Sequence, residues 1–293
     1  MSSGLVAISR KIKDMESILK ISEALQLISS TKLKNYRDMR EKGRDYVEGI
    51  KFLFRSFYSS YEHDYKVSNA KFVYIGEGGE KLSLWVVIGT DLALCGRFNA
   101  QIIDYLVKNF PLDGFLVVFG KKLFNLLKGY PALKERIIEI YPSEIKSADL
   151  VESLEVVAKF VLKEYITRGC YHLNLVHHKV GRELRNFSIL PFTKDYFGRA
   201  RTGIRYDTHY HRFDNSESII ELFPAYFERT ILVALIESKI SEHSQRRELM
   251  NNAVKAAEEK LAEYKIVYQK MRQANITQEI TEITSALKLN MGG

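Results

Sequence analysis

Glycine and proline are missing from the last quarter of this sequence. Between Ala225 and Met291, 67 consecutive residues contain neither, and Ala, Leu, Glu, Lys, Gln, Arg and Met are abundant. These residues have high helix propensity, whereas Gly and Pro interrupt helices. The segment therefore predicts a single helix, roughly 100 Å long at 1.5 Å per residue. Such a helix is several times longer than a compact domain of this size requires.

Cysteine is nearly absent as well. The two that occur, Cys95 and Cys170, are far apart, which excludes a disulfide framework and any zinc-binding spacing. This usage is typical of a reducing cytoplasm. Each cysteine would serve as a nucleophile only with a histidine beside it, so we expect two buried, inert thiols.

Long hydrophobic runs are lacking too. The run Ile231–Ile236 is far shorter than the ~20 residues that span a bilayer. Leu5–Ile8 is too short for a signal peptide, and basic residues follow it instead of preceding it. We therefore expect a soluble protein. Its net charge of +8 indicates an acidic partner, which composition leaves open as nucleic acid, a membrane surface or an acidic protein.

The N-terminal segment is also typical of a helix. Leu5–Lys42 contains no Gly or Pro, and ten basic residues stand against five acidic ones between Arg10 and Arg44. No aromatic residues alternate with these charges as base stacking would require, which favours a solvated helix face over a nucleic-acid site. Apolar residues recur at helical steps at Leu5, Ile8, Ile12, Met15, Leu19, Leu25, Ile28, Leu33, Tyr36 and Met39.

The middle of the chain alternates between strand and helix patterns, which predicts a small α/β domain. We divide the chain into an N-terminal shaft helix with its connection at 1–70, the α/β domain at 71–192, a loop at 193–216 and the C-terminal shaft helix at 217–293. Strands are expected at 82–88, 115–119, 136–141, 171–178 and 186–192, the last two as a hairpin, and helices at 98–110, 121–128 and 148–167.

The C-terminal helix carries a coiled-coil seam. Its apolar residues alternate steps of three and four at Val254, Ala257, Leu261, Tyr264, Tyr268 and Met271. The partner must be another long helix, and only the N-terminal segment is long enough. We therefore predict an antiparallel two-helix coiled coil, made from the two ends of the chain, with an inserted α/β (Rossmann-like) domain.

Two glycine-containing segments resemble phosphate-binding loops only superficially. Gly114–Lys122 has five residues between its glycines where a P-loop has four, and Lys122 replaces the Ser or Thr that would hold magnesium. Gly89–Gly96 lies between a strand and a helix but lacks the G-x-G-x-x-G spacing. We expect structural turns at both and no nucleotide cofactor.

Several histidines lie close together in the sequence, but they do not make up a complete set of metal ligands. His172 and His178 share one face of a predicted strand, His177 faces the other way, and His209 and His211 lie in the later loop. No cysteine or repeated carboxylate completes a tetrahedral set, so we expect neither a metal centre nor catalytic residues.

The C-terminal helix resembles that of the γ subunit of F-type ATP synthases. Arg272–Ile283 reads RQANITQEITEI and is similar to the family signature R-Q-A-x-I-T-x-E-[LI]-x-E-I. Further resemblance lies upstream at Glu237-Ser238, Ser241-Glu242-His243, Arg246, Met250, Asn252, Ala253 and Ala257. It continues at the front in Ile12-Lys13, Lys20-Ile21, Ala24 and Thr31-Lys32-Leu33, and in the middle in Asp91, Leu94-Cys95-Gly96 and Phe98-Asn99.

The resemblance implies a non-catalytic rotor. Such a subunit is the central stalk that couples ion flow through the membrane c-ring to ATP synthesis or hydrolysis in a head of three α and three β subunits, with ε as a further partner. Leu25, Arg246, Gln273 and Thr277 match positions that contact β. The implied location is peripheral, on the cytoplasmic face of a bacterial membrane. No cofactor and no nucleic acid are implied.

This sequence departs from the family pattern at two places. One is the central motif after Asp91, and the other is the segment that contacts the c-ring in the family, which is called the foot here. Leu92-Ala93 replaces Arg-Gly, and His211-Arg212 stands where the family often has a Tyr-Glu pair that touches the c-ring. An arginine there reverses the sign of a contact. One alternative is the γ-like shaft of an F1-like ATPase paralogue that drives another machine, such as gliding motility, and is cytoplasmic. Another is a basic coiled-coil adaptor that binds nucleic acid with steep salt dependence.

Overall fold

The computed structural model describes residues 3–61, 82–144, 150–190 and 217–291. The chain divides into two compact units, one formed by Met1–Thr31 with Arg246–Gly293 and the other by Lys32–Gln245. Two long helices, α1 (Ser3–Tyr61) and α7 (Glu217–Met291), contribute to both units. The domain boundaries inferred from the sequence stay a prediction.

Both long helices extend further than the sequence patterns indicated. Helix α1 continues beyond Lys42, through Gly43 and Gly49, to Tyr61. A glycine costs a helix only about 1 kcal/mol relative to alanine, so it weakens a helix without ending it. Helix α7 begins at Glu217, and Pro224 lies inside it, although the Gly- and Pro-free segment that predicted the helix begins only at Ala225. The proline forfeits one backbone hydrogen bond within the second turn.

A five-stranded sheet lies at the centre of the second unit, in the order β3-β2-β1-β4-β5. Strands β1 (Ser83–Ile88), β2 (Phe115–Phe119), β3 (Ile137–Tyr141) and β4 (His172–His178) are parallel. Strand β5 (Leu184–Leu190) pairs antiparallel with β4, which confirms the predicted hairpin. The order reverses direction at β1, as in doubly wound folds.

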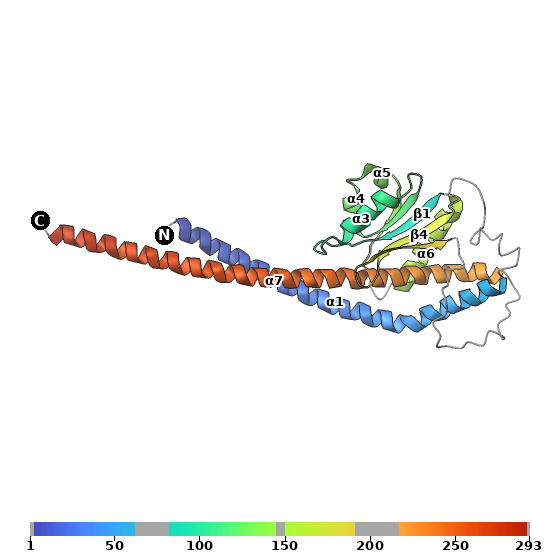
Figure 1. Cartoon of the computed structure of the whole chain (residues 1–293), viewed down its shortest axis with the longest axis horizontal. Helices are drawn as coiled ribbons and strands as arrows, with labels where there is room; N and C mark the ends of the chain where they lie inside the picture. Colours follow the sequence, from blue (N-terminus) through green and yellow to red (C-terminus); the bar gives the residue numbers. More distant parts are fainter. Residues whose placement is uncertain (1–2, 62–81, 145–149, 191–216, 292–293) are drawn as a thin grey trace. The chain divides into compact units, whose positions relative to one another are not determined.

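Helices cover both faces of the sheet (Figure 1). One face packs against α3 (Phe98–Asn109), α4 (Lys121–Leu127) and α5 (Pro131–Lys134), a short turn that we had not predicted. The other face packs against α6 (Leu150–Thr167) and the first part of α7. Parallel strands buried on both faces require the continuous apolar runs seen in β1 and β2. The predicted fold class is confirmed.

In the first unit, α1 and α7 run antiparallel. Gly4 lies against Met271, Lys11 stacks over Tyr264, and Gln26 donates a hydrogen bond to Asn251 at 3.2 Å. Successive contacts thus move towards the C-terminus on α1 and towards the N-terminus on α7, which is the antiparallel pairing predicted for the two ends of the chain. Among the described helices, none has an apolar stretch sufficient to cross a bilayer.

Candidate functional site

The seam between α1 and α7 follows the predicted residues on α7 but not all of those on α1. On α7, buried or half-buried apolar side chains of the first unit recur at Met250, Val254, Ala257, Leu261, Tyr264, Tyr268 and Met271. On α1 the buried positions include Ile8, Ser22 and Ser29, whereas Ile28 is 52% exposed. Ile28 belongs to the apolar residues that recur at helical steps, yet it is exposed, because the seam passes through small serines at these turns.

This shift leaves an apolar stripe at the surface of α1. Ile18, Ile21 and Ile28 are exposed and Leu25 is half-buried, at successive steps of three, four and three residues. Residues with that spacing lie on one face of a helix. The stripe therefore offers a continuous apolar surface that α7 does not cover.

A second apolar stripe follows the last described turns of α7. Ile276, Ile280, Ile283 and Leu287 are all exposed and alternate steps of four, three and four. The seam on α1 begins near Gly4, which meets Met271, so these four residues lie C-terminal to that contact. Exposed apolar residues in a contiguous row mark an interaction surface.

The residues matched to β-subunit contacts occupy different environments. Gln273 and Thr277 are exposed one turn apart, and the Thr277 hydroxyl donates to the Gln273 carbonyl at 3.0 Å. Leu25 belongs to the α1 stripe, whereas Arg246 is only 4% exposed. The structure therefore presents three of these side chains to solvent at least in part. Their contacts stay predictions, and His211 and Arg212 lie outside the described residues.

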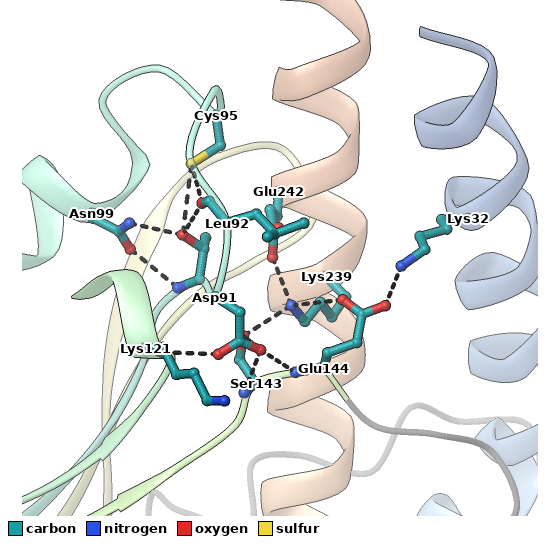
Figure 2. A network of polar contacts seen from close by, with 11 residues as sticks. Lys32, Asp91, Leu92, Cys95, Asn99, Lys121, Ser143, Glu144, Lys239 and Glu242 are labelled. Atoms are coloured by element: carbon teal, nitrogen blue, oxygen red, sulfur yellow. Dashed lines mark hydrogen bonds and ion pairs between the residues drawn. The ribbon is translucent and has the colours of Figure 1, made fainter. Parts of the chain in front are cut away.

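A polar network occupies the carboxyl edge of the sheet in the second unit (Figure 2). Asp91 follows β1, Lys121 follows β2, and Ser143 and Glu144 follow β3, so the three loops meet at one edge. Asp91 Oδ1 accepts the Lys121 N–H at 2.9 Å. Its Oδ2 accepts the N–H groups of Ser143 (2.9 Å) and Glu144 (2.7 Å) and the Ser143 hydroxyl (3.1 Å).

These hydrogen bonds determine the ionisation of Asp91. Burial raises its pKa, but the amide donors of Lys121 and Glu144, the charge of Lys239 and the Ser143 hydroxyl together lower it below the ordinary value. The carboxylate is thus charged at neutral pH and occupies amide donors that a phosphate would use in a nucleotide-binding fold. Gly120 permits this arrangement, because at its φ of +111° a Cβ would lie 2.7 Å from the Thr90 carbonyl oxygen.

Lys239 of α7 enters the same network. It is only 1% exposed, and its Nζ donates to Glu242 Oε2 at 2.8 Å and to Ser143 Oγ at 2.9 Å, with Glu144 Oε2 at 3.7 Å. Glu144 also pairs with Lys32 of α1. Burial raises the pKa of Glu144, but the Lys32 hydrogen bond and the charges of Lys239, Lys32 and His243 lower it overall. The network therefore joins α7, α1 and three loops of the sheet.

A second polar contact joins the sheet to the same helix. His177 Nε2 lies 3.2 Å from Glu237 Oε2, and Arg40 Nη2 lies 3.8 Å from the other oxygen of that carboxylate. Burial raises the pKa of Glu237, but the hydrogen bond and charge of His177, followed by Arg40 and Lys179, lower it overall. His178 points to the opposite face, where its ring lies against that of Phe98 with the centroids 3.9 Å apart. The predicted alternation of His177 and His178 is confirmed.

The described residues include no group of side chains suited to metal binding, and their two cysteines are not placed for nucleophilic chemistry. Within the ranges that the structure describes, no three His, Cys, Asp or Glu side chains converge to hold a metal ion. Cys95 and Cys170 are both buried, as predicted. Burial raises the pKa of the Cys170 thiol to about 11, which leaves it protonated and weakly nucleophilic at neutral pH. His209 and His211 lie outside the described residues.

We expect His178 to make the chain sensitive to acid. Burial, aided by the charge of His177, lowers its pKa from 6.5 to about 4. Between these values the unfolded chain binds the proton and the folded chain does not, so stability falls as pH drops. Urea titrations of the isolated chain should show about 2–3 kcal/mol of loss between pH 7 and 4.5 from this group, and His178→Phe should remove that component.

A control on the same strand separates this effect from general acid sensitivity. His172 is only half-buried, so His172→Phe should retain the loss of stability in acid. Equal pH dependence in His178→Phe and the parent would contradict the assignment.

Comparison with known proteins agrees with the sequence resemblance. Residues 4–288 match the family model described as ATP synthase. A protein of Clostridium botulinum (strain Okra / Type B1) named ATP synthase gamma chain is 30% identical over 292 residues, which cover 96% of each chain. This chain belongs to the ATP synthase gamma-chain family. A further family member, from Malacoplasma penetrans (strain HF-2), is 28% identical and covers 98% of this chain and 99% of its own.

Solved structures share the fold of this family member. A chain of the Euglena gracilis mitochondrial ATP synthase matches with a TM-score of 0.65 at 15% identity, covering 97% of this chain and 94% of that one. A chain of the rotor of the same enzyme matches with a TM-score of 0.60 at 15% identity, covering 92% and 99%. These likenesses extend over both long helices and the α/β domain.

Sequence reasoning identified the family but missed part of its polar network. Asp91 was noted within the central motif, whereas Ser143, Glu144 and Lys239 were not selected. One local signal was available for Lys239, since it is a lone cation between the apolar run Ile231–Ile236 and Ile240. A lysine on the buried face of a helix requires a partner.

Proposed function

We propose that this chain is the γ subunit of a bacterial F-type ATP synthase, the rotating central stalk between a membrane c-ring and a head of α and β subunits. Its family membership across residues 4–288 carries this proposal. The 75-residue helix α7, paired with α1, supplies the length and stiffness that a shaft requires. In this role the chain binds no nucleotide itself and contributes no catalytic residue to the enzyme complex.

The two apolar stripes are the proposed bearing surfaces inside the head. Apolar contact is non-directional, so a row of isoleucine and leucine side chains can slide past successive partners without a fixed geometry. Leu25 lies in the α1 stripe, and Gln273 and Thr277 lie beside the start of the α7 stripe. We assign these three residues and Arg246 to contacts with β subunits.

The foot of the shaft is assigned to the c-ring through the segment that contains His211 and Arg212, with ε as a neighbouring subunit. This places the chain peripherally at the cytoplasmic face of the cell membrane. An arginine in place of an acidic residue favours a c-ring surface with a complementary charge. Purification of the chain with a c-ring supports this assignment, whereas purification with α and β but never with a c-ring favours the F1-like paralogue.

Co-expression with the α and β subunits of the same organism tests the proposal. The tagged chain should recover both subunits in a complex that hydrolyses ATP. Ile280→Asp/Ile283→Asp should reduce recovery about ten-fold or more, because it places two charges in an apolar contact. Val156→Asp changes an exposed apolar residue of α6 and serves as the matched control. Failure of the parent chain to recover α and β would refute the proposal.

A further inference from the structure

The apolar contact between α7 and the sheet holds the helix without fixing its rotation. Phe223, Phe227, Ile231 and Leu235 are buried in the core cluster that they share with the strands and α6. Dispersion and hydrophobic burial depend on area and packing more than on direction. A small turn of α7 about its own axis exchanges one set of apolar contacts for a similar one.

Directional contacts come from polar side chains of α7: Glu237 meets His177 of β4, and Lys239 reaches the loop after β3. The Lys239 amine is buried, and it donates to acceptors on α7 itself and on the loop after β3. Rotation of α7 would carry Nζ away from Ser143 and Glu144 and would leave a buried charge with fewer partners. The energy of the contact therefore rises steeply with angle.

The acceptors on the sheet are themselves held in place. Asp91 binds the backbone of both Ser143 and Glu144 and also the Ser143 hydroxyl, while its other oxygen binds the backbone of Lys121 (Figure 2). The loop that receives Lys239 is thus fixed to the ends of β1 and β2. An angular change in α7 is transmitted to the sheet and is not absorbed by a loose loop.

Stability alone does not account for such an arrangement. Replacing a buried ion pair by apolar side chains of similar volume is often neutral or stabilising, and buried polar groups can instead specify register. What the Lys239 contact adds, beyond stability, is a fixed rotational position of α7 relative to the sheet.

We propose that Lys239, Glu242, Ser143 and Glu144 fix the rotational register of α7 on the α/β domain, so that torque applied to the helix passes to that domain. Lys239 acts here as a positioning residue. This inference rests on the proposed rotor function, since it assigns the element that makes shaft and domain turn together.

A single-molecule measurement on the assembled complex tests the inference. The head is fixed to a surface, and a gold rod is attached to α3 through the introduced thiol of Lys108→Cys, an exposed position. Both native cysteines are buried, which directs the label to the new thiol. The angular variance of the rod during catalytic pauses then reports the torsional stiffness between head and α/β domain.

The informative variant is Lys239→Met/Glu242→Leu, which removes both buried charges together. We expect it to fold, to assemble and to hydrolyse ATP at the parent rate without load, while the angular variance rises on the order of two-fold. Lys159→Met/Glu155→Leu removes an exposed ion pair from α6 and should leave the variance unchanged. If the first variant does not fold, Glu144→Gln carries the test, with a smaller rise expected.

The outcomes separate this inference from the proposed function. Parent-like variance in a correctly assembled Lys239→Met/Glu242→Leu complex would overturn the inference and leave the rotor function intact. An equal increase in the α6 control would overturn it as well, because the effect would then not be specific to the contact. A parent chain that does not assemble with α and β refutes the proposed function itself.

Discussion

Lys239→Met lowers the free energy of unfolding by about 3–5 kcal/mol, because it removes one partner from a buried ion pair. Glu242 is 2% exposed and accepts from Lys239 at 2.8 Å. Without that amine, its carboxylate has to remain charged in a dry environment or take up a proton, and either costs free energy. Urea titration of the isolated chain at neutral pH, followed by circular dichroism, measures the loss.

Two further variants test whether this loss of stability comes from the buried charge. Lys260→Met removes the amine of an exposed pair at the same i, i+3 spacing on the same helix, and it should leave stability close to that of the parent. Adding Glu242→Leu to Lys239→Met should recover most of the stability, since the buried carboxylate that Lys239 contacts is then removed as well. A double variant as unstable as the single one would show that lost packing, and not the remaining Glu242 charge, causes the effect.

Leu235→Ala should destabilise the second unit by about 2–5 kcal/mol through the loss of buried surface and the cavity left behind. Leu235 has no exposed surface and belongs to the core cluster that α6 and α7 form with strands β1, β2, β4 and β5. The same helix offers a matched control in Leu287, which is exposed in the apolar stripe near its end.

Leu287→Ala should leave the stability of the isolated chain within about 0.5 kcal/mol of the parent, because its methyl groups already contact water. Thermal unfolding of both variants, side by side, checks the difference. Comparable losses at the two positions would mean that the apolar end of α7 is covered in the isolated chain.

Local patterns in the sequence were sufficient for the elements of the fold. The residue pattern 115–119 predicted β2 to the residue, and the alternation of His177 and His178 followed from the two-residue period of a strand. The ends of the long helices were misjudged. Gly49 and Pro224 weaken a helix by a few kcal/mol at most, and packing along the rest of the helix outweighs that cost.

Within the shaft, residue type predicted burial poorly at some turns. Ile28 belongs to the apolar pattern of the N-terminal segment and is exposed, while Ser22 and Ser29 are buried. Hydrophobicity determines the free energy of exposing a side chain to water. Which face of a helix is covered depends instead on the line along which the two helices approach most closely. That line depends on the partner helix, which the pattern of α1 alone does not contain.

The sequence by itself determined the two long helices, the α/β insertion and membership of the gamma-chain family, because each depends on local periodicity or on a motif read in order. Only the tertiary structure decided that Lys239 reaches Ser143, 96 residues away along the chain, and that Asp91 occupies the edge where related folds bind phosphate. Hydrogen bonds and ion pairs require atoms within about 3–4 Å. Residues distant in sequence meet at that range only after the sheet has brought its loops to one edge.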